Sequence, residues 1–121
     1  VICSGETLAG RPSPLMLWKA LVELGVWPAW ECIKVDDAPV GIGEGRAAGA
    51  WTVGVAASGN GVGLDRERLH ALSPQERADA IARSAAMLDE AGADYVIDSI
   101  ADLWPVIETI AHRIDRGERP R

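Results

Sequence analysis

The sequence predicts an α/β domain in which a parallel sheet of about four strands is flanked by helices. Short apolar, β-branched runs alternate with amphipathic helical segments along the chain. The apolar runs lack the polar alternation of half-exposed strands, which is typical of strands buried on both faces. Glycine or proline separates most segments. The chain has 121 residues, about the length of one domain, so we treat residues 1–121 as a single unit.

The first half of the chain contains three predicted strands and two predicted helices. The strands are residues 1–4, the apolar part of ECIKVDD, and residues 51–58. The first helix covers residues 14–24, with Ser13 as N-cap before a proline and Gly25 as its C-terminal cap. The second helix covers VGIGEGRAAGA and ends near Gly49.

The second half adds two helices around a fourth strand. A helix over residues 74–90 begins at Ser73, which forms a capping box with Glu76, and ends at Gly92. The strand covers residues 94–98. The last helix covers residues 100–114, and because Pro105 interrupts the pattern we expect regular helix to begin near it. The closing DRGERPR is predicted to be a solvated tail.

Composition narrows the function classes. Lys and Arg number 12 and Asp and Glu 18, a net charge of −6, which disfavours nucleic acid as a partner because phosphate binding relies on basic residues. No apolar run approaches the ~20 residues of a membrane span, and no signal peptide is visible, so we expect no membrane association and a cytoplasmic protein. Cys3 and Cys32 lack CxxC spacing and are predicted to be reduced, buried thiols.

Candidate site residues follow three of the predicted strands. They are the loop from Ser4 to Arg11, the pair Asp36 and Asp37, and Ser58 with the glycines after it. In an open parallel sheet the carboxyl ends of the strands share one edge, where ligands bind. We therefore expect these features to converge there.

The paired aspartates have two interpretations. Two adjacent carboxylates repel each other, and a hard cation such as Mg²⁺ removes that cost. Aspartate is also common at strand ends as a turn former or helix cap. Arg11 also has two interpretations. Its planar guanidinium suits phosphate or phosphonate oxygens, but an arginine in a loop is often simply solvated.

Several other features carry weaker signals. GIGEGR lacks the last glycine of the dinucleotide fingerprint, because Arg46 stands there, so its small residues are better explained by close packing of a helix on the sheet. Lys34 is expected to point outward or to pair with one of the aspartates.

The two histidines, His70 and His112, have no partner at a spacing typical of a metal site or catalytic triad and are expected at the surface. The tryptophans are predicted to serve core or interface, and Trp18, Trp27 and Trp30 together suggest an apolar dimerisation patch.

Three stretches together resemble the phosphonoacetaldehyde hydrolases, members of the haloacid dehalogenase superfamily. They are AGRPSPLMLWKALVELGV, IKVDDAPVGIGEGRAAGAWTVGVAASGN and the GL that follows, and AGADYVIDSIADLWPVIETI is similar more weakly. The resemblance implies a partial Rossmann-like core, Mg²⁺ as cofactor, and hydrolysis of phosphonoacetaldehyde to acetaldehyde and phosphate. In that reaction a lysine forms a Schiff base with the aldehyde and an aspartate attacks phosphorus.

The resemblance also assigns roles and shows gaps. Asp37 stands at the metal-binding position, with Asp36 giving a paired version of the motif, and Arg11 stands where the phosphonyl group binds. Asp36 replaces a glycine found in some members, and Gly41 an aspartate found in some relatives. The D-x-A-G-T-type nucleophile motif, the serine or threonine motif and the cap domain with its lysine are absent. Lys19 and Lys34 do not match the Schiff-base position.

We therefore expect residues 1–121 to be the C-terminal part of a haloacid dehalogenase-like core domain, inactive alone. The start at Val1, without methionine, agrees with that expectation. Two alternatives stay open. In the first alternative, the chain is a binding or assembly module that associates through its exposed sheet edge or apolar surface, for example as a homodimer. Alternatively, it is part of another phosphatase-like member of the superfamily, because substrate choice rests with the cap.

Overall fold

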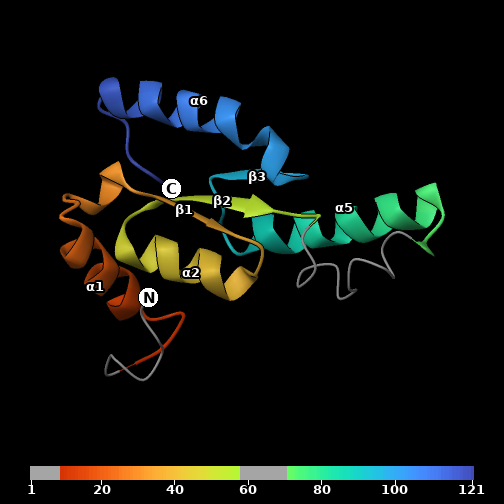
Figure 1. Cartoon of the computed structure of the whole chain (residues 1–121), viewed down its shortest axis with the longest axis horizontal. Helices are drawn as coiled ribbons and strands as arrows, with labels where there is room; N and C mark the ends of the chain where they lie inside the picture. Colours follow the sequence, from red (N-terminus) through yellow and green to blue (C-terminus); the bar gives the residue numbers. More distant parts are fainter. Residues whose placement is uncertain (1–8, 58–70) are drawn as a thin grey trace.

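The computed structural model describes residues 9–57 and 71–121, which form a sheet with helices on both faces (Figure 1). The elements in chain order are α1 (Leu15–Leu24), η2 (Ala29–Glu31), β1 (Ile33–Asp36), α2 (Pro39–Ala48), β2 (Trp51–Val55), α5 (Pro74–Glu90), β3 (Tyr95–Ile97), η3 (Ile100–Asp102) and α6 (Leu103–Asp115). The three strands are parallel, in the order β1-β2-β3. Val35 pairs with Val53, which pairs with Tyr95 on its other side.

The predicted α/β class is confirmed, and three of the four predicted strands are present in the described residues. The strand expected at residues 1–4 lies outside them. The third predicted strand is shorter than expected, because β2 ends at Val55, and Ser58 falls outside the described part of the chain.

The helix boundaries follow the predicted caps with small shifts. Helix α1 begins at Leu15, one residue later than predicted, so the N-cap is Pro14 and the prediction of Ser13 as N-cap is wrong. The Ser13 hydroxyl nevertheless accepts a hydrogen bond from the Leu15 amide. Gly25 ends α1 in the left-handed region at φ 71°, as expected of a C-terminal glycine. The Ser73 hydroxyl accepts from the Glu76 amide at the start of α5. Helix α6 begins at Leu103, so Pro105 lies in its first turn, where proline is tolerated.

The sheet face that α6 covers holds the larger apolar cluster. Its buried members are Trp51, Val53, Val55, Ile97 and Ile110. Ile33 and Val35 of β1 pack against them from the same face. Because side chains alternate along a strand, the intervening Lys34 and Asp36 are directed to the opposite face, where α1 and α2 lie.

The opposite face is packed by α2 and α5 (Figure 1). Ile42, Ala56, Leu88 and Ala93 form its buried cluster. Helix α2 approaches the sheet closely at Gly45, where an added Cβ would lie 2.6 Å from the Thr52 methyl group and 3.0 Å from the Lys34 Cγ. The interpretation that the small residues of GIGEGR serve close packing is confirmed at this position.

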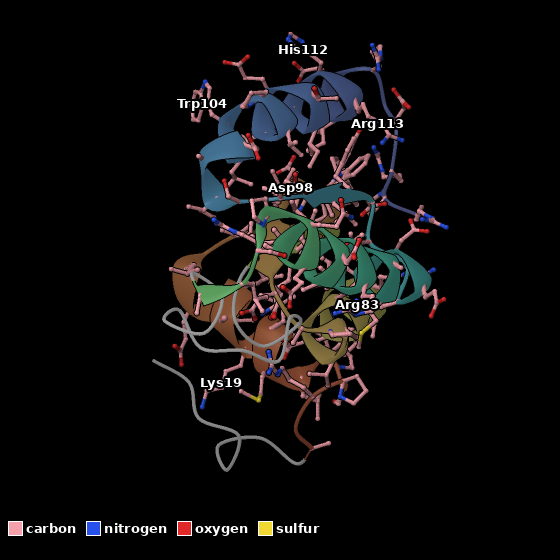
Figure 2. All side chains as sticks on the ribbon, turned by 90° about the vertical axis from the view of Figure 1, so that its right-hand side faces the viewer. Lys19, Arg83, Asp98, Trp104, His112 and Arg113 are labelled. Carbon is pink, nitrogen blue, oxygen red and sulfur yellow. The ribbon has the colours of Figure 1, made fainter. Side chains whose placement is uncertain are left out.

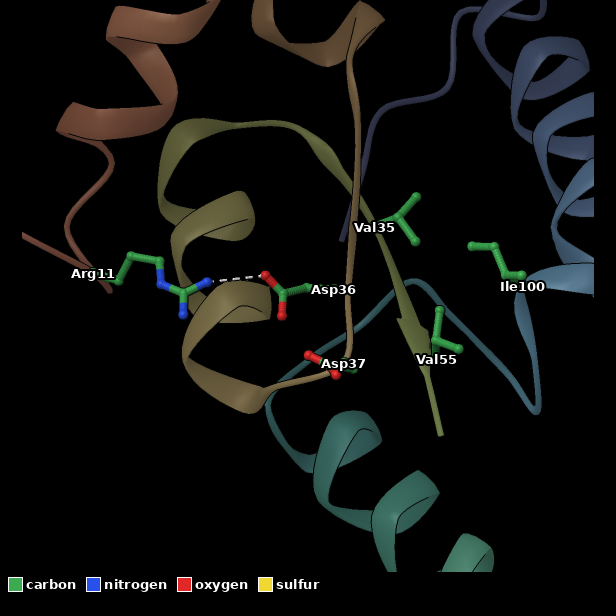
Figure 3. A pocket seen from close by; sticks show the side chains of 6 residues that line it. All are labelled: Arg11, Val35, Asp36, Asp37, Val55 and Ile100. Carbon is green, nitrogen blue, oxygen red and sulfur yellow. Dashed lines mark hydrogen bonds and ion pairs between the residues drawn. The ribbon is translucent and has the colours of Figure 1, made fainter. Parts of the chain in front are cut away.

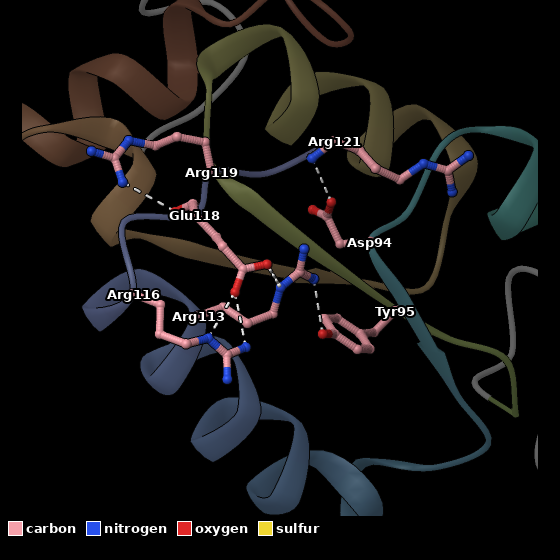
Figure 4. Close-up of polar contacts among 7 residues, drawn as sticks. All are labelled: Asp94, Tyr95, Arg113, Arg116, Glu118, Arg119 and Arg121. Carbon is pink, nitrogen blue, oxygen red and sulfur yellow. Dashed lines mark hydrogen bonds and ion pairs between the residues drawn. The ribbon is translucent and has the colours of Figure 1, made fainter.

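The C-terminal segment is largely exposed to solvent, as predicted, but it is also docked on the fold through several side chains (Figure 4). The Arg121 amide donates to Asp94 at 2.7 Å, and Glu118 is paired with both Arg113 and Arg116. The Arg119 guanidinium lies 3.6 Å from the centre of the Trp30 ring. We call Arg113, Arg116 and Glu118 the tail cluster.

The tryptophans divide between core and surface. Trp51 is fully buried beneath the Arg113 guanidinium, which lies 4.6 Å from its ring centre. Trp104 and His112 lie on the outer side of α6 (Figure 2), and both are exposed. The surface position expected for His112 is therefore confirmed, whereas His70 lies outside the described residues.

Candidate active site

A cavity of about 430 Å³ lies at the carboxyl ends of β1 and β2 (Figure 3). The described residues that line it are Arg11, Val35, Asp36, Asp37, Val55 and Ile100. All three residues that the sequence singled out for ligand binding are therefore at one place. Ser4 and Ser58, expected at the same edge, lie outside the described residues.

Each lining residue is placed by a different part of the fold. Asp36 is the last residue of β1, and Asp37 belongs to the turn between β1 and α2. Arg11 reaches the edge from the segment before α1, and Ile100 from η3 just after β3. Ile100 was missed by sequence reasoning, because a single exposed isoleucine in a helical segment carries no signal for a site.

Both carboxylate oxygens of Asp36 have protein partners. Oδ1 accepts a hydrogen bond from the Ala38 amide at 2.9 Å. Oδ2 lies 3.1 Å from Arg11 Nη1 and 3.2 Å from Lys34 Nζ. Burial by itself raises the pKa of Asp36, but the Ala38 amide, Lys34 and Arg11 together outweigh it and hold the pKa below its ordinary value of 3.8.

The ion pairs extend from Asp36 into the fold. Lys34 Nζ also lies 3.3 Å from an oxygen of Glu44, which is on α2 and almost fully buried. We call Arg11, Asp36, Lys34 and Glu44 the site network. The expectation that Lys34 pairs with an aspartate is confirmed. Glu44 was missed by sequence reasoning, because its pairing with Lys34 depends on how closely α2 packs on β1.

Asp37 differs from its neighbour. Within the described residues its carboxylate makes no hydrogen bond or ion pair, and it lines the cavity (Figure 3). Mg²⁺ in proteins is commonly held by one or two carboxylates together with water or phosphate oxygens. The carboxylate of Asp37 fits that chemistry, while Asp36 is already neutralised by two cations. No group of three or more His, Cys, Asp or Glu side chains in the described residues forms a complete metal centre.

A second, apolar groove of about 320 Å³ lies on α1 and the segment after it. It is lined by Trp18, Leu21, Val22, Gly25, Val26 and Trp27. Trp27 and Val22 are largely exposed. Trp30, which the sequence grouped with these residues, packs instead against Arg119.

The remaining predicted features are quickly placed. Cys32 is a free, half-buried thiol, and burial raises its pKa more than the nearby Lys34 lowers it. Cys3 lies outside the described residues. In the described part of the chain, none of the helices is both long and apolar enough to span a bilayer.

Comparison with known proteins gives one consistent result. The chain is 52% identical over 120 residues to the phosphonoacetaldehyde hydrolase of Paraburkholderia xenovorans strain LB400, covering 99% of this chain and 45% of that protein. It is 50% identical over 111 residues to the phosphonoacetaldehyde hydrolase of Aeromonas hydrophila, covering 92% of this chain and 40% of that protein. No protein-family model matches the chain.

A solved structure agrees with the sequence matches. The crystal structure of a phosphonoacetaldehyde hydrolase-like protein from Oleispira antarctica superposes with a TM-score of 0.93 at 49% identity, covering 98% of this chain and 43% of that one.

The fold is thus that of an α/β core of the haloacid dehalogenase type, with a charged cavity at the carboxyl edge of its parallel sheet. By sequence the chain is a homologue of the phosphonoacetaldehyde hydrolases. It spans less than half the length of the curated relatives it matches.

Proposed function

We propose that residues 1–121 are the C-terminal part of the core domain of a phosphonoacetaldehyde hydrolase and supply its metal-binding and phosphonyl-binding groups. The substrate is a small phosphonate, and the reaction breaks its carbon–phosphorus bond to give acetaldehyde and phosphate. The observation that carries the proposal is the meeting of Arg11 and Asp37 at one cavity on the carboxyl edge of the sheet.

The proposed roles follow from the chemistry of these side chains. Arg11 binds phosphonyl oxygens through the guanidinium nitrogens that Asp36 leaves open. Asp37 is the proposed Mg²⁺ ligand, because its carboxylate faces the cavity without a protein partner in the described residues. When bound, Mg²⁺ would offset the negative charge of the phosphonate and of the phosphate released from it.

The covalent steps of the proposed reaction need groups from outside this chain. The chain has two lysines, Lys19 and Lys34, and neither lines the cavity. The ammonium of Lys34 is engaged by Asp36 and Glu44. We therefore assign the Schiff-base lysine and the nucleophilic aspartate to another part of the natural polypeptide, and we expect residues 1–121 alone to be inactive. We place the enzyme in the cytoplasm, in keeping with a free thiol at Cys32.

Phosphate release from phosphonoacetaldehyde tests the proposal. The natural polypeptide that carries this sequence should turn over the substrate in the presence of Mg²⁺ and lose activity with a chelator. Residues 1–121 alone should release no phosphate above background. Turnover by the isolated chain would contradict the assignment of the covalent groups, and inactivity of the natural polypeptide would contradict the proposed function.

The apolar groove supports a second property, self-association as a homodimer. Exposed, contiguous apolar side chains such as Trp18, Val22 and Trp27 are typical of protein interfaces. Sedimentation of the natural polypeptide over a wide concentration range should show a dimer that the Trp27→Ser variant weakens. A Trp104→Ser variant is the matched control, because Trp104 is also exposed but lies on α6. A monomer at all concentrations would contradict the homodimer.

A further inference from the structure

The site network alternates in charge from the interior of the fold to the cavity. Glu44 of α2 pairs with Lys34 of β1 at 3.3 Å, Lys34 with Asp36 at 3.2 Å, and Asp36 with Arg11 at 3.1 Å. The side chain of Glu44 is 4% exposed and that of Asp36 10%, whereas Arg11 at the cavity is 39% exposed. The least exposed charge, Glu44, therefore lies at the end of the network away from the cavity, and each charge is paired with the next one outward.

The coordination of Asp36 leaves it poorly suited to a divalent cation. Its Oδ1 is used by the Ala38 amide, and its Oδ2 by Arg11 and Lys34. A cation bound at Oδ2 would lie beside two positive side chains and would have to displace at least one of them. Asp37, one residue on, has no such competitors in the described residues.

A glycine makes the conformation of Asp36 possible. A Cβ at Gly41, in the first turn of α2, would overlap the Asp36 carboxylate. Glycine therefore leaves the space that the carboxylate occupies between Arg11 and Lys34. Alanine is otherwise favoured over glycine inside a helix, so helix stability does not require glycine here.

We propose that Asp36 is a positioning residue for Arg11, held in place by Lys34 and Glu44, and that of the two adjacent aspartates Asp37 alone serves the metal. Asp36 takes one nitrogen of the Arg11 fork and so fixes the direction in which the others face the cavity. This inference rests on the proposed function, because it takes Arg11 as the group that binds the phosphonyl oxygens.

Phosphate binding without metal separates the two roles of Asp36. Inorganic phosphate is titrated by calorimetry into the natural polypeptide that carries this sequence, in the presence of a chelator. If Asp36 positions Arg11, Asp36→Asn should weaken phosphate binding by about tenfold, because the variant loses the charge-assisted hydrogen bond that orients the Arg11 guanidinium. If Asp36 serves only the metal, removing its negative charge should leave phosphate binding unchanged or make it tighter, and either result would overturn the proposal.

Magnesium titration gives the complementary measurement. Asp37→Asn should raise the Mg²⁺ concentration needed for half-maximal activity by about a hundredfold, and Asp36→Asn by less than about threefold. Equal effects of the two variants would make Asp36 a metal ligand and contradict the proposal.

A pair of glycine variants tests the geometry without changing any charge. Gly41→Ala should weaken metal-free phosphate binding because the new methyl group displaces the Asp36 carboxylate. Gly43→Ala, two residues on in the same helix, is the matched control, since the described neighbour that its Cβ would meet is Pro12, at an ordinary 3.4 Å. Unchanged binding by Gly41→Ala would count against the proposal. Failure of the proposed function is seen separately, as an Arg11→Ala variant that binds phosphate like the wild type.

Discussion

The described residues contain two clusters of ion pairs that are alike in composition but differ in how deeply their carboxylates are buried. The site network contains Glu44 and Asp36, with side chains 4% and 10% exposed. In the tail cluster, Glu118 is 40% and Arg116 66% exposed, although its shortest pair, at 2.8 Å, is closer than any in the site network (Figure 4). Distance alone would rank the tail cluster first.

The difference shows that burial, rather than distance, determines how strongly the protein responds when one partner of an ion pair is removed. An exposed pair is screened by water and salt and is worth little, whatever its length. A buried pair contributes little net stability, but removal of one partner leaves a charge without compensation. The site network should therefore be sensitive to single substitutions, and the tail cluster should not.

The largest effect is expected at the outer end of the site network. Arg11→Ala removes the fork proposed to bind phosphonyl oxygens and should lower kcat/KM by about a hundredfold or more in the phosphate-release assay. Arg11→Lys keeps the charge but loses the two-pronged geometry and should recover only a small part of the activity. Full activity of the lysine variant would mean that charge alone matters at this position.

Glu44→Gln tests the inner end. The amide leaves Lys34 with Asp36 as its remaining ion-pair partner in the described residues, so the free energy of unfolding should fall by about 1–3 kcal/mol. Urea unfolding followed by circular dichroism measures the change. Glu118→Gln is the matched control from the tail cluster and should leave the urea midpoint unchanged. Equal losses in the two variants would remove the distinction that burial makes between the clusters.

Moving the carboxylate from position 36 to position 41 should have an effect of intermediate size on phosphate binding. Because a Cβ at Gly41 would occupy the space of the Asp36 carboxylate, an aspartate there can replace it near Arg11 and Lys34. Asp36→Gly should weaken metal-free phosphate binding, and the double variant Asp36→Gly/Gly41→Asp should regain part of the lost affinity. If the double variant binds phosphate no better than Asp36→Gly, the site requires the carboxylate on the strand.

The sequence predicted the elements better than the connections between their side chains. Alternating apolar runs and caps located the described strands and helices, since burial and backbone capping are local properties. The convergence of Arg11 with Asp36 was predicted from the shared edge of parallel strands. The link from Lys34 to Glu44 was not, because it depends on how closely α2 packs on β1 at Gly45.

The docking of the exposed tail was not predicted, for a related reason. A polar, arginine-rich segment is typical of a solvated end, and sequence alone does not show that Trp30 and Asp94 lie within its reach. The backbone amide and guanidinium of Arg121 bind the turn before β3 through Asp94 and Ala93. Such docking arises from tertiary position, which neither composition nor periodicity encodes.

The smallest effect is expected from pH at the tail cluster. The hydrogen bond from Arg116, followed by that from Arg113, holds the pKa of Glu118 below its ordinary value of 4.5. A carboxyl with a lowered pKa in the folded state favours docking above its ordinary pKa, and that contribution is lost as pH falls through the folded value. Acidification below pH 4.5 should therefore loosen the tail locally.

Tryptophan is a convenient reporter of this loosening, because Arg119 stacks on the half-buried Trp30 next to Glu118. The NMR signal of the Trp30 indole should shift in the acid range in the wild type and stay constant in Glu118→Gln, while far-ultraviolet circular dichroism remains unchanged in both. A simultaneous loss of helix signal would mean that the tail cluster supports the whole fold. In that case the tail cluster would contribute to the stability of the whole fold despite its exposure to solvent, and the proposed contrast with the site network would be wrong.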